Sequence, residues 1–342
     1  ELTVPLYVVL MSVLGGSRNW FGPAVGATII TTLLYAFISG GEAMVGRAIV
    51  ALILILAILW LPDGIVPAVK TWLKRRRPVE AKPHAAVVPV VPAAPPRIGT
   101  RNILEARGAA KRFGGLQALA GVDLDVREGE ILGLVGPNGS GKTTLINVIS
   151  GFYPLTGGTI TVDGAEIGHL PAHEIARRGV ARTYQIPRPF TNMTVLDNVA
   201  MAATFGGPPR TPAEIRDEAL HWIGFTGLAG KEQALPAELN LHERKFLELA
   251  RALAAKPKLL LLDEVLSGLN PAEVDNAIRL VRAIRAQGAT IVFVEHLMRA
   301  VVELSDRVAV LNEGKLFALG APREVMRDPR VVSIYLGKAY AA

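Results

Sequence analysis

The chain has 342 residues, half of them hydrophobic, and a mean hydropathy of +0.35, so it can hold two domains and is too apolar for an average soluble protein. Residues 1–100 hold nine Lys and Arg against four Asp and Glu, and residues 101–342 hold 28 against 26, which sums to the net charge of +7. The basic excess thus lies mainly beside apolar segments, unlike a basic groove, and we expect no nucleic-acid partner. The absence of cysteine excludes a disulfide scaffold and a thiolate metal site and fits a reducing compartment.

The N-terminal region predicts helices within a membrane. Only four charged residues lie between Thr3 and Val69, and three apolar stretches stand out, at 4–14, 24–39 and 48–61. The third is the best candidate to span a bilayer. Its 14 residues reach about 21 Å at 1.5 Å each, short of the roughly 30 Å hydrocarbon core, unless the helix starts near Ala43 with Arg47 reaching outward.

A basic cluster follows this third stretch and predicts the orientation of the segment. Its members are Lys70, Lys74, Arg75, Arg76 and Arg77. By the positive-inside rule the cluster marks the cytoplasmic side, Trp60 lies at the interface, the turn at 39–42 is external and 15–22 is cytoplasmic. The alternative is a pair of buried hairpin helices in a soluble protein.

The composition divides the chain into three parts. Residues 1–77 form the apolar part, residues 78–100 are rich in Pro and Ala and predict an extended, semi-rigid linker, and residues 101–342 form a second domain. Because the chain begins at Glu1, without Met and inside an apolar run, we interpret it as a piece of a longer polypeptide.

The second domain reads as α/β with a mainly parallel sheet, because short apolar runs alternate with longer amphipathic stretches. The clearest buried strands are 131–135, 258–262 and 290–294. The first continues into a segment that fits G-x-x-x-x-G-K-[ST], composed of Gly136, Pro137, Asn138, Gly139, Ser140, Gly141, Lys142, Thr143 and Thr144. In such a loop, backbone N–H groups cradle a phosphate, Lys142 reaches the β- and γ-phosphates, and the Thr143 hydroxyl can ligate Mg²⁺.

An acidic pair, Asp263 and Glu264, directly follows the second strand. Beside a phosphate-binding loop, Asp263 is expected to bind Mg²⁺ through water and Glu264 to act as the general base for the attacking water. The alternative is that the pair only caps a helix.

The motifs together resemble the ABC transporter ATPases, over nearly all of 101–342. The segments that carry this resemblance are 136–143, Tyr184-Gln185, LLLLDE at 259–264, Ser267-Gly268-Leu269-Asn270 and Glu295-His296. A further set is similar to the ATPases of branched-chain amino-acid importers in particular: RTYQ at 182–185, MTVLDNV at 193–199, ELARALAAKPKLLLLDE, VEH, VLNEGKLFALGAPREV and YLG at 335–337. The resemblance implies a P-loop NTPase domain with a helical subdomain, using ATP and Mg²⁺.

The resemblance also implies roles for three residues outside the phosphate loop. Phe113 would stack on adenine, Gln185 would sense Mg²⁺ and the membrane partner, and His296 would contact the γ-phosphate. Each has an alternative: Phe113 as a core residue, Gln185 as a surface amide, and His296 as a strand-end histidine satisfied locally.

The N-terminal part carries a weaker resemblance. GGSRNWFGPAVGA at 15–27 and LPDG at 61–64 resemble the C-terminal part of the permease subunit of the same importers. Glycine-rich breaks occur in many membrane helices, so the motif is less specific. The two resemblances together imply a permease tail, in transmembrane helices, fused to its ATPase.

The signature motif departs from the family pattern L-S-G-G-Q. Asn240 stands for Ser, His242 for the second Gly and Glu243 for Gln. In this family two ATPases enclose ATP, each presenting its signature to the other's γ-phosphate. Asn240 still offers a side-chain donor and His242 adds positive charge, but a Cβ at 242 can hold the backbone away from the phosphate. Because the phosphate loop and the acidic pair match the family pattern, we favour active hydrolysis. After the acidic pair, Val265 stands where a proline is usual in this family.

The leading hypothesis is the energy-coupling ATPase subunit of an ABC importer for branched-chain amino acids or a related small polar solute. The alternatives are a regulatory subunit that binds ATP with little turnover, and a non-transport ABC ATPase. The expected partners are permease subunits, a second and different ABC ATPase, and a periplasmic or extracellular solute-binding protein. The expected location is a bacterial inner membrane, with the ATPase on its cytoplasmic side; the sequence does not specify the solute.

Overall fold

The computed structural model describes residues 3–16, 21–38, 52, 55, 64–66, 98–207 and 210–336, and the chain divides into two compact units. The first unit is Glu1–Lys82 and the second is Pro83–Ala342. Apart from residues 52 and 55, the predicted spanning stretch at 48–61 lies outside the described residues, as do the basic cluster at 70–77 and most of the linker.

Two apolar helices are described in the first unit, α1 (Thr3–Gly15) and α2 (Gly22–Ile38), which correspond to the first two predicted apolar stretches. Among the residues that the structure describes, no helix has both the length and the apolar character needed to cross a membrane.

Glycines allow α1 and α2 to pack backbone against backbone. A Cβ added at Gly26 would lie 1.8 Å from the carbonyl oxygen of Met11, and one at Gly15 would lie 1.7 Å from that of Gly22. Only residues without a side chain fit at these positions. The glycines of the 15–27 motif therefore set the contact between the two helices.

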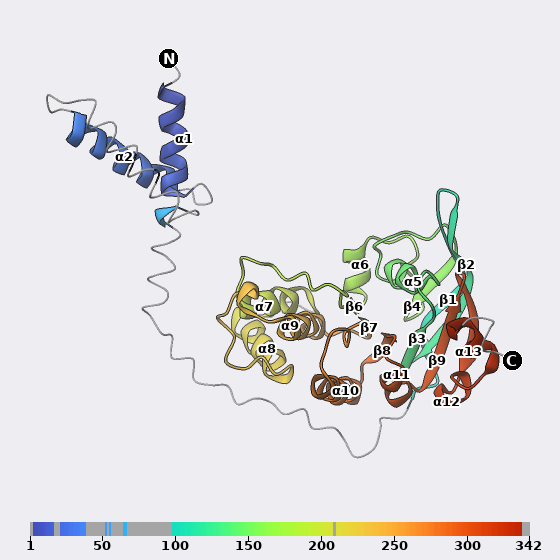
Figure 1. Cartoon of the computed structure of the whole chain (residues 1–342). Coiled ribbons are helices and arrows are strands. Elements are labelled where there is room, and N and C mark those ends of the chain that lie inside the picture. The colour runs from blue at the N-terminus through green and yellow to red at the C-terminus, as the bar shows by residue number, and fades with distance from the viewer. Residues whose placement is uncertain are drawn as a thin grey trace. The chain divides into compact units, whose positions relative to one another are not determined.

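The second unit contains two sheets and a set of helices (Figure 1). The four-stranded sheet has the order β2-β1-β4-β5 and the six-stranded sheet the order β10-β9-β3-β8-β7-β6. The strands are β1 (Asn102–Phe113), β2 (Leu116–Arg127), β3 (Ile131–Val135), β4 (Gly157–Val162), β5 (Ala165–Glu166), β6 (Val180–Arg182), β7 (Leu259–Asp263), β8 (Thr290–Val294), β9 (Arg307–Asn312) and β10 (Lys315–Gly320). The helices are α5 (Lys142–Ile149), α6 (Ala172–Arg177), α7 (Val195–Phe205), α8 (Pro212–Phe225), α9 (Leu241–Ala254), α10 (Pro271–Ala286), α11 (Met298–Leu304), α12 (Pro322–Val325) and α13 (Pro329–Leu336), with a 3₁₀ turn at Pro236–Glu238.

The central strands of the six-stranded sheet are buried on both faces, as the continuous apolar runs predicted. In β7, Leu260 and Leu262 join the cluster formed with α7–α11, whereas Leu259 and Leu261 join the cluster formed with α5 and the four-stranded sheet. The pairings of β6, β7, β8, β3 and β9 are all parallel, and only β10 runs antiparallel to its neighbour. The predicted α/β architecture is therefore confirmed; the strand expected at 258–262 lies one residue later.

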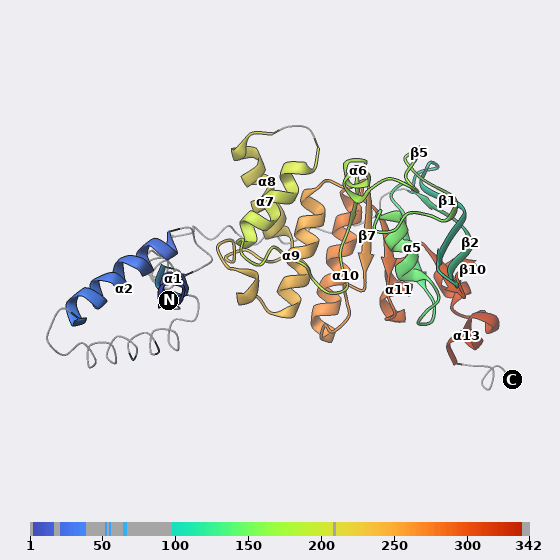
Figure 2. The same ribbon diagram turned by 90° about the horizontal axis from the view of Figure 1, so that it is seen from above.

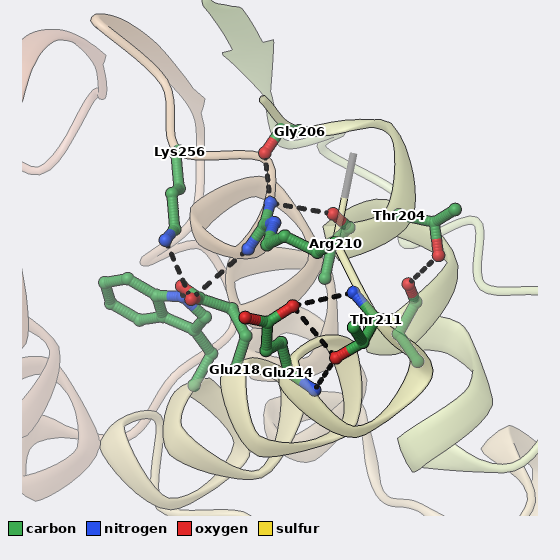
Figure 3. A network of polar contacts seen from close by, with 10 residues as sticks. Thr204, Gly206, Arg210, Thr211, Glu214, Glu218 and Lys256 are labelled. Atoms are coloured by element: carbon green, nitrogen blue, oxygen red, sulfur yellow. Dashed lines mark hydrogen bonds and ion pairs between the residues drawn. The ribbon is translucent and has the colours of Figure 1, made fainter. Parts of the chain in front are cut away.

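Helices α7, α8 and α9 form a helical subdomain at the end of the second unit opposite β1 and β2 (Figures 1 and 2). A polar network fixes the turn from α7 to α8 (Figure 3). Arg210 donates to the carbonyls of Ala203 and Gly206, which end α7, and pairs with Glu218 of α8 at 3.3 Å. Glu218 also binds Lys256, just beyond α9, at 2.8 Å, so one carboxylate joins three helices.

The two sheets are joined by a buried ion cluster around Arg307, the first residue of β9. Its Nε donates to Glu130 at 2.6 Å, and its Nη2 donates to the carboxylate of Asp125 in β2 at 2.9 Å. The Glu130 side chain is fully enclosed, and hydrogen bonding to it raises the pKa of Arg307 above its usual value. The cluster thus neutralises a buried carboxylate while fixing β2 to the end of β9.

We predict that Arg307→Met lowers the free energy of unfolding by about 3 kcal/mol, because it leaves the buried Glu130 carboxylate without its cation. Urea denaturation of the full chain, followed by circular dichroism, measures the change. Arg330→Met removes the same type of side chain from a solvent-exposed pair with Asp328 and should leave the curve unchanged. Equal curves for Arg307→Met and wild type would contradict this role.

Candidate functional site

The phosphate-binding motif forms a loop between β3 and α5, as predicted. Gly136 has φ 148° and Gly141 has φ 105°, both in the region that favours glycine. A Cβ at Gly136 would lie 2.2 Å from the carbonyl oxygen of Leu311, and one at Gly141 would lie 2.7 Å from that of Ala118. Both glycines are therefore required by conformation and by space.

This loop lines a cleft of about 510 Å³. The lining residues are Leu116, Gln117, Ala118, Asn138, Gly139, Ser140, Gly141, Lys142, Thr143, Thr144, Glu264, Glu313 and Gly314. Lys142 donates to the carbonyls of Gly136 at 2.7 Å and Pro137 at 3.0 Å. Burial lowers the pKa of Lys142, while the charges of Glu264 and Asp263 oppose that shift.

The loop suits a polyanion in three respects. The buried hydroxyl of Ser140 has no hydrogen-bond partner within the described part of the chain. The first turn of α5 leaves backbone N–H groups without helical partners, and the ammonium of Lys142 lies beside them. Phosphate groups therefore fit the donors that the loop presents, and Thr143 lines the same cleft.

Asp263 ends β7 as a buried carboxylate and is paired with Arg182 of β6. The distance from Arg182 Nη2 to Asp263 Oδ2 is 3.2 Å, and the same guanidinium donates to Asn147 and Ser150 of the α5 segment at 2.7 and 2.9 Å. Burial raises the pKa of Asp263, and the Arg182 charge opposes this. Sequence reasoning quoted Arg182 only within RTYQ and missed its contact with Asp263.

Glu264 has left-handed backbone geometry, with φ 50°, which is uncommon for a residue with a side chain. Its N–H donates to the carbonyl of Val294 in β8 at 2.9 Å. Its carboxylate accepts a 2.6 Å hydrogen bond from Gln185 Nε2 and faces the cleft that Lys142 lines. The structure thus brings together the predicted base, the Gln185 amide and the phosphate loop.

His296 is not among the residues that line this cleft. Its side chain is 66% exposed and belongs to a second cleft of about 300 Å³, lined mainly by residues 266–274 and 295–299. The neighbouring Glu295 is buried and accepts the N–H groups of Leu266 at 2.7 Å and His296 at 3.3 Å. Burial raises the pKa of the Glu295 carboxyl. The sequence indicated Glu295 only as part of the Glu295-His296 motif.

The altered signature begins helix α9 with a capping box. Asn240 Oδ1 accepts the N–H of Glu243 at 2.9 Å, and Glu243 Oε2 accepts the N–H of Asn240 at 3.0 Å. The cap uses the side-chain oxygen of Asn240, and the expected role of its amide as a donor stays a prediction. His242 packs against Phe246 with ring centroids 4.2 Å apart, and Glu243 pairs with Lys231.

Phe113 lies at the end of β1, paired in register with Leu116 of the cleft wall. Its ring meets that of Tyr153 edge-on at 5.0 Å, and the Lys111 ammonium lies 5.1 Å from its centroid. Tyr153 in turn packs on Phe152. Phe113 therefore belongs to an aromatic group beside the cleft, of which sequence reasoning found one member.

The segment 184–194 leads from Gln185 to the helical subdomain and is held by two buried side chains. Asn198 accepts the N–H of Phe190 at 2.8 Å and donates to the carbonyls of Phe190 and Met193 at 3.1 Å each. Glu248 of α9 accepts the N–H of Arg188 at 2.7 Å, and its pKa is raised by burial. Ile186 nevertheless remains 74% exposed, and Phe190, beneath the Arg251 guanidinium, is 48% exposed.

Comparison with known proteins identifies the family. Residues 119–267 match the family model described as ABC transporter. The chain is 39% identical to the high-affinity branched-chain amino acid transport ATP-binding protein BraF of Pseudomonas aeruginosa over 254 residues, covering 70% of this chain and 100% of that protein. The chain belongs to the ABC transporter family. LivG of Salmonella typhimurium, described by the same function, is 40% identical over 254 residues, with the same coverage.

Solved structures support the same assignment. The crystal structure of an ABC transporter ATP-binding cassette in its ADP conformation matches with 30% identity and a TM-score of 0.62, covering 70% of this chain and 100% of that chain. The predicted P-loop fold is confirmed, and the chain is an ABC ATPase of the branched-chain amino-acid transporter type.

We predict that Asn198→Ala frees the 186–194 segment, since the change removes the amide that binds its backbone. The free energy of unfolding should fall by about 2 kcal/mol, and amide hydrogen exchange should accelerate in 186–194 more than elsewhere. Hydrogen–deuterium exchange of the full chain measures both effects. The exposed Asn276→Ala serves as the matched control, and exchange that accelerates equally across the domain would refute the local role.

Proposed function

We propose that this ABC ATPase supplies the energy for importing branched-chain amino acids or a related small polar solute. The observation that supports this most directly is the meeting of Lys142, Gln185 and Glu264 at one cleft, in a domain similar over its whole length to transport ATP-binding proteins. Closure of an ATPase pair on ATP, followed by hydrolysis and product release, would drive the permease between its two access states.

Within the cleft we assign roles from position. The loop 136–144 would bind the phosphates of ATP, with Lys142 compensating their charge, and Phe113, in the aromatic group beside the cleft, would pack against the adenine ring. Glu264 orients and deprotonates the attacking water. Mg²⁺ would be held by Thr143, Gln185 and Asp263, and would neutralise charge on the transferring phosphate. Asp263 Oδ2 is paired with Arg182, so the metal would share this carboxylate with the guanidinium.

His296 is proposed to act at the γ-phosphate. Its side chain is exposed and lines a neighbouring cleft, so it would meet the nucleotide at the edge of the pair. Asn240 and His242 would complete the site of a second ATPase. This chain has an intact phosphate loop and acidic pair but an altered signature. We therefore propose a partner ATPase of different sequence, so that the two ATP sites between the subunits are unequal.

We also propose that residues 1–77 are the tail of the permease and that 78–100 tether it to the ATPase. The glycine-mediated packing of α1 and α2 supports a membrane setting, because close backbone contacts are a frequent way for helices to associate in lipid. The full transporter would include further permease subunits and a periplasmic or extracellular solute-binding protein, in a bacterial inner membrane with the ATPase on the cytoplasmic side.

A regulatory subunit with little turnover is the second candidate. The capping box at Asn240 supports it, since it places the Glu243 carboxylate, which is also paired with Lys231, at the start of the signature helix. A negative charge there is less suited to a γ-phosphate than a neutral side chain.

We predict Mg²⁺-dependent ATP hydrolysis that Glu264→Gln reduces by about 10²- to 10⁴-fold while ATP binding persists, because the substitution removes the base and keeps the shape. Steady-state phosphate release and ATP-analogue binding by the full chain measure the two effects. Lys142→Ala should instead weaken binding. Unchanged turnover in Glu264→Gln would show the base assignment to be wrong, and wild-type turnover near zero would favour the regulatory candidate.

We predict that the face formed by Gln185, Pro187, Pro189, Phe190 and Met193, extended by Ile186, docks a cytoplasmic helix of the permease; Gln185, Ile186 and Phe190 are exposed and the other three are partly exposed. Exposed apolar side chains beside the nucleotide cleft favour such a partner. Because the chain has no native cysteine, Phe190→Cys gives a single crosslinking position, with the exposed Arg279→Cys of α10 as control. Crosslinks from position 190 to permease loops are expected; crosslinks only within the same ATPase would contradict the proposal.

A further inference from the structure

Lys245 is a buried lysine whose ammonium ends among backbone carbonyls. It lies in α9, five positions after the Asn240 cap, and only 6% of it is exposed. Its Nζ donates to the carbonyl of Glu264 at 3.1 Å, to that of Val265 at 3.4 Å, and to that of Ser267. The three acceptors match the three donors of an ammonium, so the side chain is fully used.

These acceptors form the turn that follows β7. Its first residue, Glu264, holds left-handed geometry, which costs free energy unless the surroundings impose it. The N–H of Glu264 is fixed by Val294 of β8, and its carbonyl is fixed by Lys245. Gln185 holds the carboxylate. The residue is thus restrained from both sides of its backbone and from its side chain, by three different elements.

The electrostatic setting supports the same contact. No carboxylate forms an ion pair with Lys245 among the described residues, and its nearest charged influences are Glu264 and Glu295. Burial lowers the pKa of Lys245, and these two carboxylates oppose the shift. Burying a cation that contacts only carbonyl groups costs desolvation free energy. We therefore expect Lys245 to have a role other than stabilising the fold.

We propose that Lys245 is a positioning residue for ATP hydrolysis, which connects the signature helix α9 to Glu264 and keeps the carboxylate at the angle needed to orient water. The proposal rests on the assignment of Glu264 as the general base. Helix α9 begins with the signature, so a movement of this helix would shift Lys245 and, through its hydrogen bond, the backbone of Glu264. Val265, which lacks the fixed φ of proline, leaves that turn more dependent on the ammonium.

The test compares Lys245→Met and Lys245→Arg with Lys256→Met, a control that removes an exposed lysine just beyond the same helix. In the full chain, Lys245→Met should lower kcat about 10- to 100-fold, as expected for a displaced catalytic group, with KM for ATP and ATP-analogue binding within about twofold. Lys245→Arg should recover part of kcat, and Lys256→Met should match wild type.

The double variant with Glu264→Gln tests the connection. If Lys245 acts through Glu264, adding Lys245→Met to Glu264→Gln should lower kcat little further. Multiplicative losses, an unchanged kcat, or equal losses of kcat and nucleotide binding would each overturn the proposal. Lys245→Gln, which retains a donor, is the second variant should Lys245→Met not fold, and failure of both to fold would assign Lys245 to stability alone and overturn it as well.

These outcomes separate the two assignments. Full turnover in Glu264→Gln would remove the base assignment and the Lys245 proposal with it. Lost turnover in Glu264→Gln together with normal turnover in Lys245→Met would leave the base in place and reject only the role of Lys245.

Discussion

The parallel pairing of β3, β8 and β7 is the constraint on which the site depends. Val294 of β8 pairs with Leu134 of β3 on one side and with Asp263 of β7 on the other, so the three strands end at nearly the same level. The phosphate loop, the acidic pair and Glu295 each follow one of these ends. Residues separated by more than 150 positions thereby reach one edge of a sheet, where ligands bind in open α/β folds.

The buried interior on both faces of these strands restricts where charge can appear, and two of the buried carboxylates, Asp263 and Glu248, have arginine partners. Arg182 balances Asp263 and also contacts the helix after the phosphate loop. Glu248 is balanced by Arg251 and binds the backbone of Arg188. Burying these pairs costs desolvation free energy, which offsets most of their attraction. Their main effect is therefore to orient the side chains, more than to stabilise the fold.

Local sequence features predicted the strands, the phosphate loop and the acidic pair because each carries its own pattern within a few residues. The glycines are required by the local backbone and the strands by continuous apolar runs. Arg182, Lys245 and Tyr153 could not be identified in this way, since their partners lie elsewhere in the chain and nothing in their immediate neighbours distinguishes them from surface residues. The exposed position of His296 was missed for the same reason, because the motif specifies the residue but not the direction of its side chain.

Helix α9 carries three connections on one continuous 14-residue segment. Asn240 begins the helix, Lys245 meets the turn after β7, and Glu248 with Arg251 meets the backbone beyond Gln185. Each residue of an α-helix adds about 100° of rotation and 1.5 Å of rise. Insertion or deletion of one residue between Asn240 and Lys245 would therefore turn the cap away from both later connections at once. Side chains along this helix can be exchanged, as the altered signature illustrates. A change in its length by one residue would instead break the connection between the Asn240 cap and Glu264.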